Sequence, residues 1–165
     1  NKTREARVLN MISTLLSDGK SSRLYKKMVD NQKMALQIGA FCYSQEDYGM
    51  YLIYSLPQGA TKCENIVQEI DAEIKKLQTE LLTSIEIEKL KNKYEIDFIN
   101  ENATIEGLAH NFATYYLLYN DINLINTEIE IYRSITAEEI KAVAQKYLNP
   151  NQRLYLDYLP TIEQK

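Results

Sequence analysis

The 165-residue sequence has a single histidine, His110, and no tryptophan. A catalytic zinc ion is commonly held by three protein side chains, and the helical H-x-x-E-H motif needs two histidines. Glu106 stands four residues before His110, so a helix would place both on one face, but two ligands fall short of that set. A histidine on a helix surface is the more common arrangement. The sequence therefore predicts no metal-binding residues in this chain.

Glycine and cysteine are also scarce, with five and two residues. Gly19-Lys20-Ser21-Ser22 is similar to the end of a phosphate-binding loop, but Thr14 stands where the first glycine of that motif belongs. No G-x-S-x-G nucleophile elbow occurs, and neither Cys42 nor Cys63 has a histidine nearby in the sequence. We therefore predict no catalytic residues. Because the cysteines have neither metal-ligand nor disulfide-framework spacing, two buried, reduced thiols are expected.

Charge of one sign is nowhere concentrated, although the net charge is −4. A chain without a basic block has little to neutralise phosphates or anionic lipids, so we expect no nucleic-acid partner. No apolar run approaches the roughly 20 residues that cross a bilayer, so no membrane insertion is expected. The sequence begins without methionine and enters a helical pattern at once. We therefore expect a fragment of a larger protein, folded as a single domain over residues 1–165.

What the sequence does contain is alternating helical and strand periodicity. Apolar residues at spacings of three and four predict a helix over 8–16 that ends near Gly19. Ser21 or Ser22 is expected to cap a second, short helix that ends near residues 30–31. Strict alternation then predicts strands over 36–43, with Leu36 and Ile38 on one face, and over 50–56. The short polar link 44–49 predicts an antiparallel hairpin.

Helical periodicity returns after the hairpin. We predict helices over 66–81, from Thr83 to Phe98, over 108–119, over 124–134, and from Thr136 to Tyr147. Thr83-x-x-Glu86 and Thr136-x-x-Glu139 have capping-box spacing, with a hydroxyl followed three residues later by a carboxylate. Alternation over 153–159 predicts a last strand. Because helices and strands occur in groups, the fold class is α+β, a small, mostly antiparallel sheet with helices packed on one face.

Tyrosine is abundant, with 13 residues. Tyr115, Tyr116 and Tyr119 lie on neighbouring helical turns, and Tyr155 and Tyr158 lie in the last predicted strand. A tyrosine offers apolar area with one polar tip, which suits contacts between domains, although core packing with wet hydroxyls is more common. Arg23 is expected to pair with a carboxylate, either on a neighbouring element or on the surface.

Several of these features together resemble the second, non-catalytic domain of one half of an insulinase/pitrilysin-family zinc metallopeptidase. They are the segment Asp18-Gly19-Lys20-Ser21-Ser22-Arg23-Leu24-Tyr25, the hairpin, the long helix, the Thr83-x-x-Glu86 box, and the closing stretch from Tyr132 to Pro150. The resemblance rests on the order and spacing of these features, and it extends over almost the whole chain. In that family the zinc-binding H-x-x-E-H helix lies in another domain.

The resemblance implies that this chain binds no zinc itself, while its parent protein does. Its implied partners are the zinc-binding domain, in the same parent or in a paired subunit, and an unfolded peptide that the chamber encloses. It also implies that the first strand of the domain lies upstream of Asn1, which would leave an exposed sheet edge able to pair two copies as a homodimer. The implied location of the parent is the bacterial periplasm or cell envelope.

One departure limits the assignment of substrate-binding residues. Active members of the family often place an arginine and a tyrosine, seven residues apart, to hold substrate near the zinc. Val29 and Leu36 stand at those positions here, so no substrate-binding pair is assigned. This leaves two hypotheses: a peptide-enclosing domain of an active zinc endopeptidase, or a scaffold domain of an inactive member that acts in protein assembly.

Overall fold

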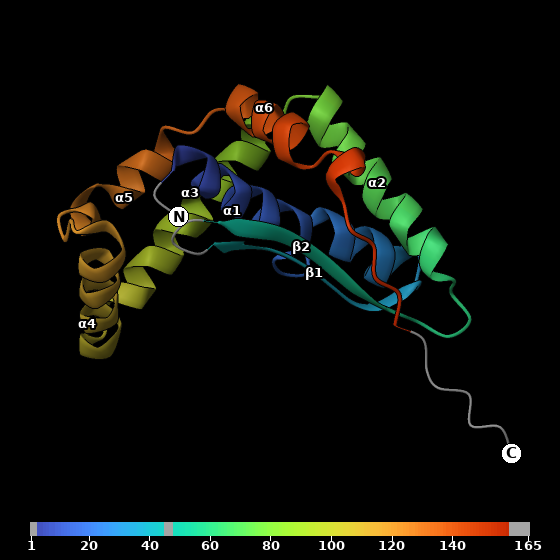
Figure 1. Cartoon of the computed structure of the whole chain (residues 1–165), viewed down its shortest axis with the longest axis horizontal. Helices are drawn as coiled ribbons and strands as arrows, with labels where there is room; N and C mark the ends of the chain where they lie inside the picture. The colour runs from blue at the N-terminus through green and yellow to red at the C-terminus, as the bar shows by residue number, and fades with distance from the viewer. Residues whose placement is uncertain (1–2, 45–47, 159–165) are drawn as a thin grey trace, which may run out of the picture.

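The computed structural model describes residues 3–44 and 48–158 (Figure 1). Its elements, in chain order, are helix α1 (Arg4–Ser17), the wide helical turn η1 (Tyr25–Asn31), strands β1 (Ala35–Ser44) and β2 (Gly49–Pro57), helices α2 (Cys63–Thr79), α3 (Ser84–Asn102) and α4 (Ile105–Thr114), η2 (Tyr115–Tyr119), α5 (Leu124–Arg133), α6 (Ala137–Tyr147) and the short helix η3 (Pro150–Gln152). The α+β class predicted from the sequence is confirmed.

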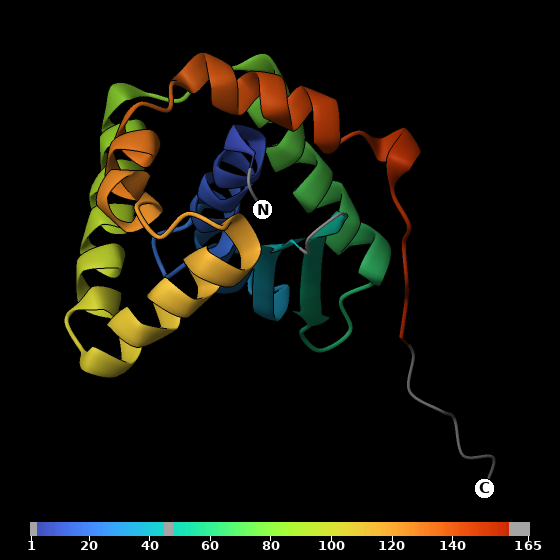
Figure 2. The ribbon, with the colours of Figure 1, turned by 60° about the vertical axis from the view of Figure 1, so that its left-hand side comes forward.

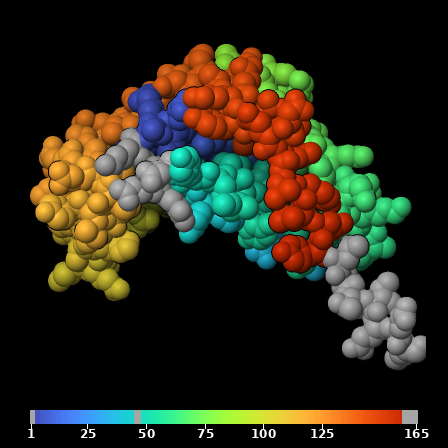
Figure 3. Space-filling model, in the orientation of Figure 1, coloured from blue at the N-terminus to red at the C-terminus, as the bar shows by residue number. Residues whose placement is uncertain are grey.

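The elements form an arch, with α4 at one end and α2 at the other (Figures 1 and 2). Helix α1 lies in the middle and packs against β1 and α6. In the space-filling view the molecule is hollowed between α4 and the C-terminal segment, and residues of the hairpin lie in the hollow (Figure 3). One face of the sheet is therefore covered by helix, and the other faces the open side of the arch.

Strands β1 and β2 form an antiparallel pair, as predicted, with Phe41 opposite Leu52 and Gly39 opposite Tyr54. A register irregularity between residues 35 and 37 shifts the alternation at the start of β1. A bulge of this kind changes the face to which a side chain points. Consequently Leu36 is exposed while Ile38 is buried, and the prediction that they share a face is wrong.

The hydrophobic core lies beneath the hairpin and around α1. Its buried side chains come from α1, η1, β1, α2, α3, α5, α6 and the links between them. The largest of those that are fully buried are Val8, Met11, Ile12, Leu16, Leu24, Met28, Leu77, Ile135 and Ile140. Helix α1 contributes four of the nine because its apolar residues recur at the helical period and it is surrounded by β1, α6 and α3. This central helix joins the sheet to the rest of the fold.

The helix boundaries follow the predicted capping signals in most places. Both capping boxes form: Thr83 and Thr136 accept from the amides of Glu86 and Glu139, whose carboxylates accept in return. Gly19 ends the first helical segment with φ +76°, a conformation that favours glycine. The predicted cap of the second helix is wrong. The Ser22 hydroxyl donates to the Gly19 carbonyl over 2.7 Å instead.

Ser21 does not cap that helix either, since its hydroxyl accepts from the Lys89 ammonium over 2.7 Å.

The strand predicted over 153–159 is also wrong in the part that the structure describes, residues 153–158. These residues have no regular secondary structure, and neither β1 nor β2 pairs with them. Arg153 is bound to Asp71 of α2, which holds the segment beside that helix. Alternation of apolar residues predicts extended backbone but does not supply the neighbouring strand that a sheet requires. Residue 159 and the hairpin link 45–47 lie outside the described residues.

No helix among the described residues is both long and apolar enough to cross a membrane.

Candidate functional site

The first candidate surface is the uncovered side of the hairpin, which we call the hairpin outer face. Its side chains alternate with those that face α1, because successive residues of a strand point to opposite sides of a sheet. They are Phe41, Tyr43, Met50, Leu52, Tyr54 and Leu56, and all are exposed by more than a third. None is charged. The surface therefore offers a continuous apolar strip to a binding partner.

Aromatic contacts give this face a defined shape. The Tyr54 ring lies over Gly39, where an added Cβ would stand 2.3 Å from a ring carbon. Phe41 meets the same ring edge-on, with ring centroids 6.3 Å apart. The Gln37 amide donates to the Tyr54 hydroxyl over 3.0 Å. Glycine at position 39 thus lets an aromatic ring lie flat on the sheet, which a side chain there would prevent.

The opposite face is fixed to α1 by hydrogen bonds as well as by apolar packing. The Ser13 hydroxyl lies 3.2 Å from the Tyr51 hydroxyl. The Ala40 amide donates to the Ser17 hydroxyl over 2.6 Å, and that hydroxyl lies 3.3 Å from the Ala40 carbonyl. Ser17 therefore occupies the backbone edge of β1 at Ala40. A second strand that paired with this edge, as the family resemblance implies, would meet α1 at this point.

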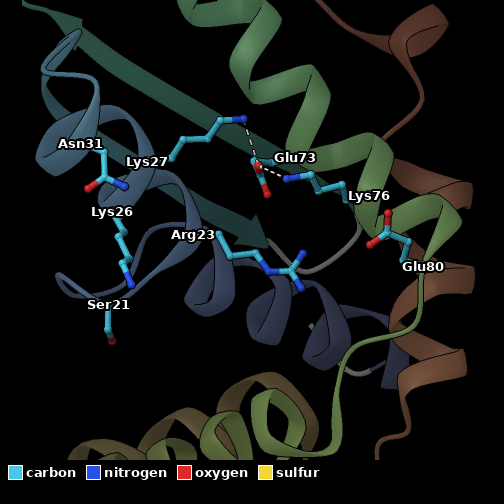
Figure 4. A pocket seen from close by; sticks show the side chains of 8 residues that line it. All are labelled: Ser21, Arg23, Lys26, Lys27, Asn31, Glu73, Lys76 and Glu80. Carbon is cyan, nitrogen blue, oxygen red and sulfur yellow. Dashed lines mark hydrogen bonds and ion pairs between the residues drawn. The ribbon is translucent and has the colours of Figure 1, made fainter.

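A second candidate surface is a hollow of about 440 Å³ between η1 and α2. Figure 4 shows its side chains, with Glu73 between Lys27 and Lys76. The lining residues are Ser21, Arg23, Lys26, Lys27, Asn31, Glu73, Lys76 and Glu80. Most of the charges here already have partners in the chain. We therefore interpret the hollow as an ion-pair network that holds η1 against α2 and α3.

Glu73 is the centre of this network and is buried. One of its oxygens accepts from Lys27 over 3.1 Å and from Lys76 over 2.8 Å. Burial by itself raises the pKa of Glu73, but the hydrogen bonds from Lys76 and Lys27 together outweigh it and hold that pKa below its usual value. Arg23 completes the network by binding Glu86 of α3 over 2.6 Å, so of the two alternatives that the sequence left open the structure has the pairing with a neighbouring element.

Replacing Glu73 by glutamine is expected to lower the free energy of unfolding at neutral pH by about 1–2 kcal/mol, since two partly exposed lysines lose a buried partner. A lowered carboxyl pKa stabilises the fold above the unfolded-state pKa, and this contribution is lost as the pH falls through the lowered value. The difference between wild type and Glu73→Gln should therefore shrink in acid. Urea unfolding at several values from about pH 7 to pH 3 measures it.

Glu88→Gln is the matched control, because Glu88 is exposed and lies 3.9 Å from its lysine partner. Its free energy of unfolding should stay within about 0.5 kcal/mol of wild type. If the difference in the free energy of unfolding between wild type and Glu73→Gln were constant across the pH range, the lowered pKa of Glu73 would be contradicted.

The structure places the two family positions in different surroundings. Val29 lies in η1, half-buried against the core. Leu36 lies at the start of β1 and is exposed. Neither side chain has the charge or the hydroxyl of the arginine and tyrosine that the family uses at these positions. Sequence reasoning missed the hairpin outer face, although the alternation of Met50, Leu52 and Tyr54 was its signal.

The remaining candidates for chemistry lie apart from both surfaces. Glu106 and His110 are both exposed on α4, and among the described residues no three side chains of the metal-binding types come together. Cys42 and Cys63 are unpaired thiols, and they are half-buried, less than predicted. A hydrogen bond to Asp157 and burial raise the pKa of Cys63, which keeps the thiol protonated.

The tyrosines divide between the two alternatives that the sequence left open. Tyr115 and Tyr119 are half-buried, with ring centroids 5.8 Å apart, and burial raises the pKa of Tyr115 to about 12. Tyr116, Tyr155 and Tyr158 are exposed. Packing within the chain therefore explains the first two, and the last three are available for contact.

Residues 1–94 match the family described as the peptidase M16 inactive domain. Among curated proteins, the chain is 28% identical over 151 residues to "Zinc protease PqqE" of Helicobacter pylori. The aligned region covers 92% of this chain and 34% of that protein. The chain thus spans about a third of this relative's length.

Two solved structures have the same fold. A protease from Helicobacter pylori aligns with a TM-score of 0.85 and 27% identity, over 92% of this chain and 36% of that one. The inactive peptidase domain of a protein from Bordetella parapertussis aligns with a TM-score of 0.84 and 21% identity, over 99% of this chain and 87% of that one. At 21% identity, the likeness to the Bordetella parapertussis domain shows a shared fold alone.

Proposed function

This chain belongs to the peptidase M16 inactive-domain family, and from this premise we propose that it is a non-catalytic domain of a zinc metalloendopeptidase that helps to enclose unfolded peptide substrates. The zinc site would lie on another domain of the parent protein or on a paired subunit. In support, the chain has one histidine, and the described residues bring no three metal-binding side chains together. A catalytic zinc ion does not fit this chain, so no step of hydrolysis is assigned to it.

The observation that carries the proposal is the hairpin outer face. An unfolded peptide exposes apolar side chains, and the uncharged strip of Phe41, Met50, Leu52, Tyr54 and Leu56 offers them a surface. Atoms of the hairpin lie on the hollowed side of the arch (Figure 3). A wall of a peptide chamber needs such a surface, broad and without specific pockets, because its contacts must not depend on one sequence.

The proposal is tested in the full-length parent with Met50→Ser/Leu52→Ser, both on the hairpin outer face. Hydrolysis of an unstructured fluorogenic peptide by the parent should be abolished by a zinc chelator. The double variant should raise KM about tenfold, which corresponds to about 1.4 kcal/mol of lost binding, with kcat nearly unchanged. Ile85→Ser/Ile96→Ser, two exposed residues of α3, is the matched control and should leave KM as in wild type.

Equal effects of the two double variants would contradict a role for the hairpin outer face. A folded, zinc-loaded parent that cleaves no peptide would favour the second hypothesis, a scaffold domain that acts in protein assembly. The 165-residue chain alone should hydrolyse no peptide. Cleavage that survives repurification and increases with the concentration of this chain would contradict its non-catalytic role.

A further inference from the structure

Helix α4 and η2 form one continuous helical arm at the end of the arch (Figures 1 and 2). One side of this arm carries an apolar row that recurs at the helical spacings of four, seven, eight, eleven and twelve residues. We call it the arm stripe; it consists of Ile105, Ala109, Phe112, Ala113, Tyr116 and Leu117. All six are exposed, and Ile105 and Leu117 are exposed by 90% and 76%.

The other side of the arm faces α3. There Leu108 is half-buried, and the Asn111 amide donates to the Asn102 side chain over 3.1 Å. No residue of α4 or η2 is fully buried. A helix that is apolar on two opposite sides is typical of the interior of an assembly, where both sides have partners. Within the described chain the arm stripe is the side that none of these contacts covers.

We infer that the arm stripe is a contact between two copies of this chain, arranged antiparallel about a two-fold axis near residue 111. In such a contact residue i meets residue j of the second copy and j meets i, so each charge on the surface enters the contact twice. The six side chains of the arm stripe are uncharged. Glu106, the only charged residue between residues 105 and 119, is exposed next to the arm stripe, and with the axis near residue 111 it lies opposite Tyr116 of the second copy and not opposite the second Glu106. The contact therefore brings no two like charges together.

The order of side-chain sizes along the arm stripe gives the register. Alanines occupy the middle, at 109 and 113, and large residues occupy the ends. With the axis near residue 111, Ala109 meets Ala113 of the second copy, and Ile105 meets Leu117 of the second copy. Small residues at the crossing point let two helices approach to about 8 Å, the short end of the usual range, while large residues fill the space at either end.

The area is sufficient for such a contact. The exposed parts of the six residues amount to roughly 600 Å² a side, about three quarters of the ~800 Å² that each partner buries in a standard interface. The alternative route to a dimer, pairing along the edge of β1, is obstructed at Ala40 by Ser17. The arm stripe is therefore the surface that we expect two copies to share.

Sedimentation velocity of the 165-residue chain over about 1–200 μM tests this inference, a range that spans interfaces of micromolar affinity. Wild type should show a dimer that dissociates on dilution. Leu117→Glu should raise the dissociation constant of the dimer at least about 100-fold, because the two-fold axis buries two carboxylates in the contact, one from each copy. Ile85→Glu is the matched control, an exposed isoleucine of α3 outside the arm stripe, and it should dimerise as wild type does.

Both substitutions fall on exposed side chains, so thermal unfolding of the two variants at low concentration should match wild type and exclude a folding defect. A chain that stays monomeric throughout the range would overturn the inference. So would a dimer that Leu117→Glu and Ile85→Glu affect equally. Neither result depends on peptidase activity, so the proposed function is tested separately.

Disulfide cross-linking tests the register of the two arms. The native thiols are first removed by Cys42→Ser and Cys63→Ser. A mixture of Ala109→Cys and Ala113→Cys copies should form a disulfide-linked dimer on mild oxidation, because facing alanines bring their Cβ atoms within disulfide range. Ala109→Cys alone should cross-link poorly. Efficient cross-linking of Ala109→Cys alone, with none between 109 and 113, would overturn the antiparallel arrangement.

Discussion

Arg7→Met is expected to lower the free energy of unfolding by about 3–5 kcal/mol, one of the largest effects of any single substitution in this chain. Arg7, in α1, binds Glu128 of α5 with two parallel hydrogen bonds of 2.8 and 2.6 Å. The two side chains are only 8% and 14% exposed. Removing the guanidinium leaves the Glu128 carboxylate largely buried without its ionic partner, and the loss of that partner dominates the cost.

The hydrogen bonds to Glu128 also raise the pKa of Arg7, so the guanidinium stays charged at any ordinary pH. Urea unfolding at neutral pH measures the effect. Arg4→Met provides the comparison, because Arg4 pairs with Glu139 on the surface and should cost about 1 kcal/mol or less. The double variant Arg7→Met/Glu128→Leu should recover most of the loss, since it removes both charges together.

Equal losses for Arg7→Met and Arg4→Met would mean that burial adds nothing to the Arg7–Glu128 pair. A double variant no more stable than Arg7→Met would mean that packing of the arginine stem, and not the unpaired carboxylate, accounts for the effect.

Leu16→Ala is expected to lower the free energy of unfolding by about 2–5 kcal/mol. Leu16 has no exposed surface and lies in α1, between the hairpin and the other helices of the core. Truncation removes buried methyl groups and leaves a cavity that the surrounding β1, α3 and α6 cannot fully close. Chemical denaturation with fluorescence or circular dichroism measures the change in the midpoint.

Two variants show that volume at this site decides the result. Leu16→Met keeps most of the volume and should cost less than about 1.5 kcal/mol. Ile85→Ala removes a comparable side chain from the exposed surface of α3 and should change stability by about 0.5 kcal/mol or less. A loss for Leu16→Ala as small as that for Ile85→Ala would contradict the position of α1 at the centre of the core.

The capping boxes and the hairpin show which features are encoded locally. Thr83 with Glu86, and Thr136 with Glu139, satisfy free amides within one helical turn, so their spacing predicts the helix starts without any knowledge of the rest of the fold. The strand pair is likewise predictable, because short polar links between alternating segments favour an antiparallel hairpin. The lack of an H-x-x-E-H motif follows from composition, since one histidine cannot supply the two that this motif needs.

Other features depend on residues far apart in the sequence, and the tertiary structure decided them. Alternation in β2 separates Leu52 from Ile53 but does not tell which faces α1; Ser13 and Ser17, more than 20 residues away, fix that choice. The bulge at the start of β1 directs Leu36 outward. The segment 153–158 is bound to α2 through Arg153 and pairs with neither strand. The burial of Arg7 depends on Glu128, 121 residues away.

The sequence by itself therefore determined the element types, the α+β class and the absence of a zinc motif, because these rest on interactions within a few residues or on composition. The structure alone decided which apolar side chains are covered. Periodicity predicts that a helix or strand has two different faces. Packing against distant elements decides which face is covered and which is exposed, as it does for the hairpin outer face and the arm stripe.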